Sequence, residues 1–412
     1  MRAPRYSDWD TEIFSDPVID QPHTMYTRLR EATPLSRIGE SGFHLVSHWD
    51  LIEEVLNREE DFSANLTGVL YEANEGQPGA FELPGGEQGA TSVIATADDP
   101  RHAVHRLLIQ PRFTGRIAAM EAPIREWARE ALQSWFSAGG GDVIPAAERL
   151  PARVVAHLLG LPEEDLDHFR RWSMLGGDLL AGQITGDGLL NLAAETDNMR
   201  QYLARHLDLA LQSPRRGRKE PLLHMLACGM QDDIISREEA LGITTVLFGA
   251  GGESTAALIG SCFKWLSQDQ QLADHLREHS DDIPRFVEEI TRLEPPFKFH
   301  YRAVRTNCKL AGFTLQPGDR LLLSWAAANR DPQRFEQPDK LGLKRKYPKQ
   351  HMAYGRGLHF CIGAVLARLE GRIMVEEILS GTRLLKLSDD QTPVYTRSIF
   401  IRRLERLSLD FQ

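Results

Sequence analysis

The sequence contains few cysteines, no long hydrophobic run and no excess of basic residues, and each absence excludes a class of protein. Its four cysteines, Cys228, Cys262, Cys308 and Cys361, are too scattered for a disulfide framework or a C-x-x-C metal or redox site. No stretch reaches roughly 18 apolar residues, and residues 1–10 have no apolar core, so neither a membrane span nor a signal peptide is expected. The 48 basic and 58 acidic residues give a net charge of −10, which disfavours a general nucleic-acid or acidic-membrane binder.

What remains is the composition of an ordinary globular protein, 42% hydrophobic and 26% charged over 412 residues. A chain of this length buries a core large enough to enclose a cofactor without disulfides. No internal repeat and no linker divides the sequence, so we expect a single domain over residues 1–412, located in the cytoplasm.

Hydrophobic periodicity predicts helices along most of the chain, because apolar residues recur at three- and four-residue spacing. The clearest helical segments are 121–136, 192–211 and 258–276, and the short strand-like segments are 43–46, 308–315 and 320–323. This profile predicts a mainly α fold with small β-sheets rather than alternating βαβ units. Glycine-rich residues predict a turn at 139–142 and a long mobile loop at Glu75–Ala90.

The most informative segment is Ala353–Gly363, which reads Ala-Tyr-Gly-Arg-Gly-Leu-His-Phe-Cys-Ile-Gly. A helix start follows at Ala364, so Cys361 lies where free backbone amides can stabilise a thiolate. A single buried cysteine is by default a small hydrophobic residue. The glycine-shaped loop, His359 and the helix start together favour a thiolate ligand instead. Because no second Cys or His stands at zinc spacing, an axial ligand to haem iron fits better.

This segment resembles the haem-binding loop of the cytochrome P450 family, F-x-x-G-x-x-x-C-x-G, with Tyr354 where the family usually has Phe. The resemblance implies a mainly α cytochrome P450 fold in which haem b (iron protoporphyrin IX) lies between distal and proximal helices. It implies that the Cys361 thiolate is the metal ligand and that Tyr354, His359 and Gly363 lie at the cofactor. Tyr354 keeps an aromatic ring near the thiolate and adds a hydroxyl that needs a partner.

Residues 244–257 surround a glycine-rich centre with apolar side chains and carry an acid beside two hydroxyls. Each interior glycine costs a helix about 1 kcal/mol relative to alanine, so we expect a reason for it, such as close approach of a ligand or a local widening of the helix. The segment resembles the family's distal helix, A-G-x-[DE]-T, with Ser254 in place of the usual Thr. The resemblance assigns Ala250 and Gly251 to cofactor binding, and Glu253, Ser254 and Thr255 to catalysis as groups that deliver protons.

The same residues allow a hydrolase hypothesis. Gly252–Ala256 is one residue short of G-x-S-x-G, the nucleophile elbow of α/β-hydrolases, with Ser254 as the nucleophile. No H-G-G-G oxyanion motif and no βαβ alternation accompany it. The hydrolase hypothesis is therefore the remote alternative.

Haem carries two carboxylates, which require basic partners when the ring is buried. His102 and Arg106 match the family's H-x-x-x-R and lie on one helical face. Arg302 matches the arginine that follows the Pro295–Pro296 turn, and His359 is the third candidate partner. Further similar segments at Leu150–Pro162, Ala327–Pro332 and Thr396–Leu407 extend the resemblance over nearly the whole chain.

Glu289 and Arg292, three residues apart, match the family's E-x-x-R, a buried structural ion pair behind the haem. The family's third partner comes from the segment that resembles Pro338–Leu341. Lys340 occupies the position that often holds Arg or His, so the network is expected while its third member stays open.

The chain has no flavin or iron–sulfur module of its own, so electrons are expected from a separate ferredoxin or flavodoxin with its reductase. Such carriers are usually acidic. A basic cluster near the cysteine is a candidate docking surface, and it contains Lys344, Arg345, Lys346, Lys349 and Arg356, with Arg106 and Arg112.

The substrate pocket is the least determined part of the prediction. By resemblance, it is lined by the Glu75–Ala90 loop and by Val246, Leu247, Phe297, Phe299, Ile399 and Phe400. These side chains suit a small to medium, largely apolar molecule with one polar anchor at most. Lys298 or His300 could meet an acid group of the substrate, but both are expected to face outward.

The resemblance implies a monomeric monooxygenase that inserts one oxygen atom from dioxygen into its substrate. The alternatives are a haem-thiolate binding or sensing protein and a peroxide-driven oxidase, neither of which needs Glu253 beside Ser254. Binding of nucleic acid or of a membrane is not expected.

Overall fold

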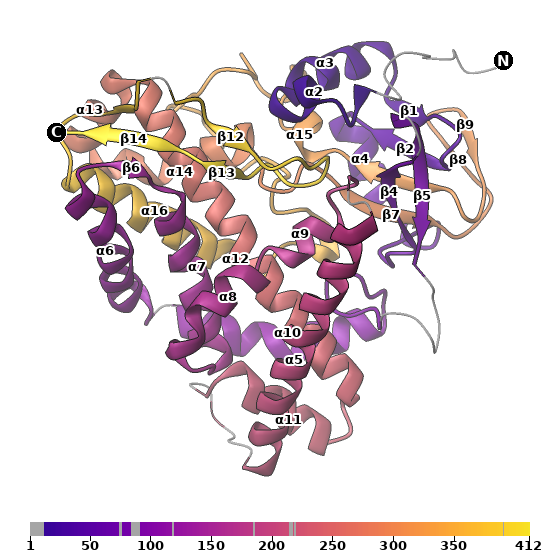
Figure 1. Ribbon diagram of the computed structural model, residues 1–412. Helices are drawn as coiled ribbons and strands as arrows, with labels where there is room; N and C mark the ends of the chain where they lie inside the picture. The colour runs from indigo at the N-terminus through magenta and orange to yellow at the C-terminus, as the bar shows by residue number, and fades with distance from the viewer. Residues whose placement is uncertain are drawn as a thin grey trace.

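The computed structural model describes residues 12–73, 76–83, 91–117, 119–183, 186–213, 217, 220–389 and 391–412. Figure 1 shows the N-terminal helices and small strands at the upper right and the long helices in the left and lower parts of the molecule. The C-terminal strands lie at the upper left, beside the start of the helical part. The fold is mainly α with small sheets, as predicted.

Helices form most of the described chain. They are α2 (Asp16–Asp20), α3 (Pro22–Ala32), α4 (Trp49–Leu56), α5 (Arg101–Ile117), α6 (Glu121–Ala138), α7 (Ile144–Leu159), α8 (Leu166–Trp172), α9 (Leu175–Leu179), α10 (Gly186–Gln212), α11 (Leu222–Gln231), α12 (Arg237–Gln268), α13 (Gln270–Glu278), α14 (Ile283–Leu293), α15 (Trp325–Ala328) and α16 (Ala364–Ser380).

The strands build several small sheets. They are β1 (Leu35–Ile38), β2 (Phe43–Val46), β3 (Phe62–Ser63), β4 (Gly68–Glu72), β5 (Pro78–Glu82), β6 (Gly141–Asp142), β7 (His300–Val304), β8 (Cys308–Leu310), β9 (Phe313–Leu315), β10 (Arg320–Leu323), β11 (Leu385–Leu387), β12 (Val394–Tyr395), β13 (Leu404–Arg406) and β14 (Ser408–Phe411). The largest sheet has the order β1-β2-β10-β7-β3, with β2 and β10 parallel and the other pairs antiparallel. It therefore joins the N-terminal part of the chain to the segment that leads to the cysteine loop.

Three sequence predictions need correction. The helix expected over 258–276 is two helices, because Asp269 has an extended backbone and its carboxylate accepts a hydrogen bond from the Leu272 amide, as an N-cap does. The strand expected over 308–315 is the β8–β9 hairpin, which turns at Ala311 and Gly312 with positive φ angles. The loop expected at Glu75–Ala90 contains β5, paired antiparallel with β4, while residues 75 and 84–90 lie outside the described part.

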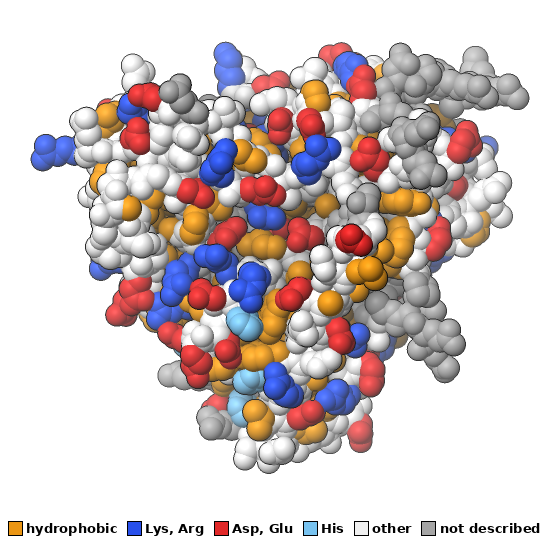
Figure 2. Space-filling model, viewed as in Figure 1, with side chains coloured by type: hydrophobic (Ala, Val, Ile, Leu, Met, Phe, Trp, Pro, Cys, Tyr) orange, Lys and Arg blue, Asp and Glu red, His pale blue; other side chains and the backbone are white. Residues whose placement is uncertain are grey.

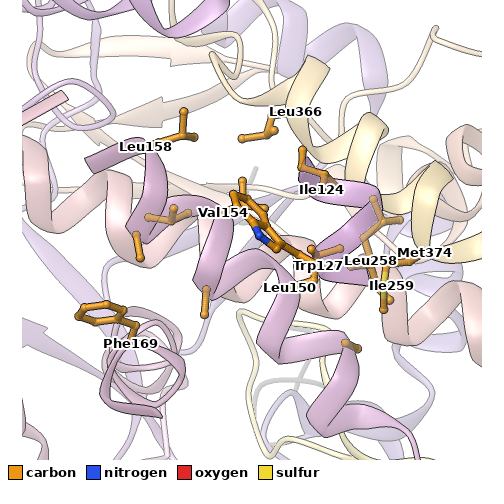
Figure 3. Close-up of a cluster of buried hydrophobic side chains, with 14 of the residues drawn as sticks. Ile124, Trp127, Leu150, Val154, Leu158, Phe169, Leu258, Ile259, Leu366 and Met374 are labelled. Carbon is orange, nitrogen blue, oxygen red and sulfur yellow. The ribbon is translucent and has the colours of Figure 1, made fainter. Parts of the chain in front are cut away.

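The hydrophobic core of the helical part fixes how the site-bearing helices meet. Figure 3 shows Ile124, Trp127, Leu150, Val154, Leu158, Phe169, Leu258, Ile259, Leu366 and Met374 converging from α6, α7, α8, α12 and α16. Gly371 on α16 allows close contact with α14 and α12, since a Cβ there would lie 3.1 Å from Val287 Cγ1 and 3.5 Å from Leu258 Cδ2. The helix that follows the cysteine is thus held against the distal helix.

The helix α12 is long and apolar enough to cross a membrane, the one such helix in the part of the chain that the structure describes. Of its most apolar stretch, 67% is buried inside the protein, which is how a core helix behaves. On the face shown in Figure 2, acidic and basic side chains are intermixed.

Candidate active site

A large, mostly apolar cavity lies between α12 and the loop that carries Cys361. The predicted site residues on its wall are Arg106, Val246, Leu247, Ala250, Gly251, Ser254, Thr255, Phe297, Arg302, Tyr354, His359, Cys361 and Gly363. The sequence separates these residues by more than 250 positions, and the packing of α12 against α16 brings them together.

The cysteine loop is shaped by glycines at two left-handed positions, Gly355 with φ of 67° and Gly357 with φ of 68°. A short 3-10 turn over Gly357–His359 follows, and the Cys361 amide then donates to the Tyr354 carbonyl at 2.9 Å. Cys361 has a large accessible surface, and this surface faces the interior cavity. The loop therefore presents one sulfur atom to the cavity.

Two opposing effects act on the Cys361 thiol. Burial raises its pKa, while the Gly363 and Ala364 amides and the Arg368 and Arg106 guanidinium groups favour the thiolate. The guanidinium carbon of Arg368 lies 4.4 Å from the centroid of the Tyr354 ring, beside the sulfur. A metal cation bound to the sulfur would lower the pKa of the Cys361 thiol and so stabilise the thiolate.

Two guanidinium groups on the cavity wall form no ion pair with any described residue. Arg302 donates to the Tyr301 carbonyl at 2.7 Å, and burial lowers its pKa to about 10. Arg106 donates to the Phe360 carbonyl at 2.7 Å. Arg302 is buried and Arg106 half-buried, and a cation removed from water without an anion is costly. A bound group with two negative charges would therefore be stabilised here. The two propionates of haem match that requirement.

His102 and His359 lie beside these arginines. Their ring centroids are 4.2 Å apart, and burial lowers the pKa of both imidazoles, that of His359 to about 3. His102 Nε2 and His359 Nδ1 are buried and have no hydrogen-bond partner among the residues described. Neutral imidazoles with unused nitrogen atoms fit hydrogen bonding to a carboxylate.

The distal hydroxyls face the cavity but the acid next to them does not. Ser254 and Thr255 line the cavity, and Ser254 Oγ donates to the Ala250 carbonyl at 2.6 Å. Glu253 is absent from the cavity wall and points to the other side of α12. Glu253 therefore lies outside the cavity that Ser254 and Thr255 line, although it adjoins Ser254 in the sequence.

Glu253 occupies a buried polar site of its own. It accepts a hydrogen bond from Arg403 Nε at 3.2 Å and from the Gly177 amide, where a Cβ would lie 2.2 Å from Glu253 Oε2. Arg403 also lies near Glu148, at 3.7 Å, and Asp178, at 3.9 Å. Burial raises the pKa of Glu253 to about 8 despite Arg403. This carboxyl therefore carries a proton at neutral pH.

Two glycines of α12, Gly251 and Gly252, have a packing reason, and Gly251 also lines the cavity. A Cβ on Gly251 would lie 2.6 Å from Val155 Cγ2 of α7, and one on Gly252 would lie 2.3 Å from Ser173 Oγ. The helix continues through them without a π-type widening. Close approach of α7 and of the residue after α8 requires both glycines.

Glu289 and Arg292 form an ion pair in which both side chains are fully buried, with Nε and Oε1 2.8 Å apart. The third partner, which the sequence left open, is Arg345, whose Nε lies 2.8 Å from Glu289 Oε2. Lys340 contributes only its backbone carbonyl to Arg292, at 3.0 Å. Arg292 also donates to the Pro338 carbonyl at 2.6 Å. The network fastens the segment before the cysteine loop to α14.

The predicted substrate pocket is partly correct in placement. Val246, Leu247 and Phe297 line the cavity, whereas Phe299, Ile399 and Phe400 are buried behind it. Phe400 stacks on Phe297, with ring centroids 4.8 Å apart, and so supports the wall from outside. No residue of the described part of the Glu75–Ala90 loop reaches the wall.

Two polar residues on the wall were missed as site residues. Glu370 is buried, its Oε2 has no partner in the described chain, and burial raises its pKa well above the usual range. Its position could have been found, because Gly363, Leu366, Ala367 and Glu370 all line the cavity at helical spacing. The second is His300, expected to face outward but found on the wall. Lys298, also expected to face outward, is buried and donates to the Ser398 carbonyl at 2.7 Å.

Among the described residues, no group of three or more His, Cys, Asp and Glu side chains is placed to hold a metal ion. Haem would supply the remaining ligands of an iron bound to Cys361. The hydrolase hypothesis is wrong, since Ser254 lies within α12 rather than in a strand-to-helix turn, and its hydroxyl donates to a backbone carbonyl.

Comparison with known proteins agrees with this geometry. The family model "Cytochrome P450" matches residues 192–409. "Cytochrome P450 144" of Mycobacterium tuberculosis is 38% identical over 410 residues, which cover 97% of this chain and 91% of the relative. The chain belongs to the cytochrome P450 family.

Other cytochromes P450 match over similar lengths. "Mycinamicin IV hydroxylase/epoxidase" of Micromonospora griseorubida is 30% identical over 381 residues, covering 89% of each chain. CYP109E1 from Bacillus megaterium, solved in complex with testosterone, superposes with a TM-score of 0.81 at 26% identity, covering 98% of this chain and 99% of that one. This P450 is therefore a haem-thiolate monooxygenase that uses dioxygen, an organic substrate and a redox partner.

Proposed function

We propose that this P450 is a cytoplasmic, monomeric, single-domain enzyme that binds haem b and oxidises a small to medium, largely apolar molecule. Electrons come from a separate ferredoxin or flavodoxin with its reductase. The observation that carries the proposal is the cavity itself, which presents one cysteine sulfur and two unpaired guanidinium groups on a mostly apolar wall. Similarity to a hydroxylase/epoxidase supports oxygen insertion as the reaction.

Cys361 Sγ would hold the iron, and the two arginines with His102 and His359 would hold the propionates. Tyr354 and Gly363 would border the ring on the cysteine side, and Ala250 and Gly251 on the α12 side. When bound, the haem supplies the activation of dioxygen. The apolar wall, including Val246, Leu247 and Phe297, excludes water and orients the substrate.

Proton delivery falls to groups on both sides of α12. Glu253 is protonated at neutral pH and lies between the half-exposed Asp178 and the helix that carries the hydroxyls. Ser254 Oγ, hydrogen-bonded to Ala250, and the neighbouring Thr255 face the cavity. In this proposal Glu253 takes protons from the Asp178 side, and the hydroxyls pass them into the cavity.

Glu253→Gln is expected to lower the rate of substrate oxidation about 100-fold, as loss of a positioned acid does. In the parent enzyme the rate should fall as pH rises through about 8, because Glu253 then loses its proton. The variant should lack this pH dependence. Turnover from pH 6 to 9 measures both effects. Glu148→Gln, next to the same Arg403 but on α7, is the matched control and should keep the parent profile.

The surface around Cys361 has the properties of a docking site for the electron carrier. Leu107, Leu358, Phe360 and Val365 are exposed there, and the Arg106 bond to the Phe360 carbonyl joins α5 to the cysteine loop. Exposed apolar side chains that gather in one place usually mark a binding site. An electron carrier bound there would lie next to the metal ligand.

The predicted basic cluster is smaller than expected. Arg345 is bound to Glu289, Arg106 borders the cavity, and Arg356 pairs with Glu53 at 3.0 Å. The Arg112 side chain lies outside the described residues. The remaining cations are Lys344, Lys346 and Lys349, which are exposed and form no ion pair with the rest of the described chain.

Lys349→Glu is expected to slow electron transfer from an acidic ferredoxin several-fold at low ionic strength, because it replaces attraction with repulsion. The difference from the parent should shrink as salt is added. Stopped-flow reduction of the haem measures it. Lys309→Glu, an exposed lysine on the β8–β9 hairpin, is the control and should change nothing. Equal rates for Lys349→Glu and parent at low salt would contradict docking through these lysines.

Turnover tests the whole proposal. The purified protein, a ferredoxin with its reductase, NADPH and a panel of apolar compounds should yield products heavier by one oxygen atom. The same panel with hydrogen peroxide instead of electrons separates a peroxide-driven oxidase, which would show product only in that arm. Spectral titration without product in either arm would favour a binding or sensing protein.

A further inference from the structure

His300 begins β7 and makes an unusually restrictive contact with Trp325 of α15. The indole Nε1 lies 2.6 Å from His300 Nδ1. An indole N–H is a donor only, so Nδ1 must accept. The neutral imidazole therefore carries its proton on Nε2. Trp325 is almost fully buried and cannot release this contact without disturbing the packing of α15.

The ring of His300 is held in one orientation with Nε2 free. It meets Phe297 at 87° and Phe400 at 77°, with ring centroids 5.5 and 5.7 Å away. No described residue accepts a hydrogen bond from Nε2, and this atom is not among the fully enclosed polar atoms. The half-buried side chain lines the cavity, as does Arg302 two residues along the same strand face. Nε2–H is thus a fixed donor toward the cavity.

The charge balance of the cavity indicates what this donor binds. Burial and the nearby Arg302 lower the pKa of His300 to about 3, so the imidazole stays neutral. Arg106 and Arg302 are the cations on the described wall without an acidic partner, and the two haem propionates would neutralise them. Arg356 already pairs with Glu53. No positive charge remains for an acidic substrate.

We propose that His300 determines substrate specificity by donating a hydrogen bond from Nε2 to an uncharged acceptor oxygen, such as a ketone, on an otherwise apolar substrate. This inference rests on the proposed function, since it names the substrate chemistry of the same cavity. Phe297 lines the apolar part of the cavity wall, with Phe400 packed behind it. His300 supplies one polar contact beside Phe297. The haem propionates are the other acceptor oxygens within the cavity, and the test separates the two.

The test is a spectral titration of the holoenzyme with pairs of compounds that differ only in C=O against CH2. Cyclohexyl phenyl ketone and cyclohexylphenylmethane form one pair, and larger and smaller pairs complete the panel. In the parent enzyme at least one ketone should bind about three- to tenfold more tightly than its hydrocarbon, the worth of one neutral hydrogen bond. His300→Phe, which keeps an aromatic ring, should abolish that preference.

His300→Gln should restore the preference, because an amide offers Trp325 an acceptor and the ligand a donor. No ketone preference in the parent, or an equal preference in His300→Phe, overturns the proposal. If ligand-free His300→Phe loses haem faster than the parent but keeps the ketone preference, His300 Nε2 donates to a haem propionate instead. That result also overturns the proposal. A different result would contradict the proposed function itself: the parent protein would lack the absorption spectrum of a thiolate-ligated haem.

Discussion

Cys361→Ser is expected to abolish oxygen insertion while leaving the protein folded. The thiolate pushes electron density to the iron and favours O–O cleavage, and a serine hydroxyl does not replace it. The loop should persist, because its shape rests on Gly355, Gly357 and the bond from the residue 361 amide to the Tyr354 carbonyl. Product formation and the unfolding curve of the same preparation measure the two expectations.

Cys308→Ser is the matched control for this prediction. Cys308 begins β8, is half-buried and does not border the cavity. Its replacement should leave turnover unchanged. Full activity in Cys361→Ser would remove the thiolate from the mechanism, and unfolding of that variant would show that the side chain shapes the loop.

Arg292→Leu is expected to lower the free energy of unfolding by about 3–5 kcal/mol, the cost of removing one partner of a buried pair. Glu289 would keep only the Arg345 contact and the Gly342 amide. The carbonyls of Asn329 and Pro338 would lose their Arg292 donor, and that of Lys340 would keep only Arg345. Because these carbonyls precede the cysteine loop, haem content should fall with stability. Urea unfolding and haem absorbance measure the two losses.

Arg237→Leu is the control, because it removes an exposed ion pair with the same nitrogen–oxygen distance. Arg237 and Asp208 are also 2.8 Å apart, but both side chains are exposed. Exposed pairs contribute about 0–1 kcal/mol, so this variant should resemble the parent. A similar small effect for Arg292→Leu would contradict a structural role for the buried network.

The sequence motifs predicted which residues belong to the site better than they predicted where the side chains point. The cysteine loop, the basic residues and the E-x-x-R pair could be placed because each depends on local spacing. Glu253, assigned to proton delivery beside Ser254, lies on the side of α12 away from the cavity, and the motif does not contain that direction. Strand alternation would likewise have put His300 on the side of Arg302.

Other features depend on contacts that no local pattern contains. Arg345 reaches Glu289 across 56 positions, and nothing in its own segment distinguishes it from the neighbouring lysines. Phe400 contacts the cavity wall through Phe297 and does not itself line the cavity, contrary to what the resemblance implied. The reason for Gly251 and Gly252 also lies outside their helix, in Val155 and Ser173.

The absorption spectrum of the reduced protein under carbon monoxide tests the central claim most directly. A thiolate from Cys361 on the haem iron predicts the strongly red-shifted Soret band that gives the cytochrome P450 family its name. A band without that shift would mean that another group, or no protein group, holds the iron. A colourless protein that cannot be reconstituted with haem would contradict the account altogether.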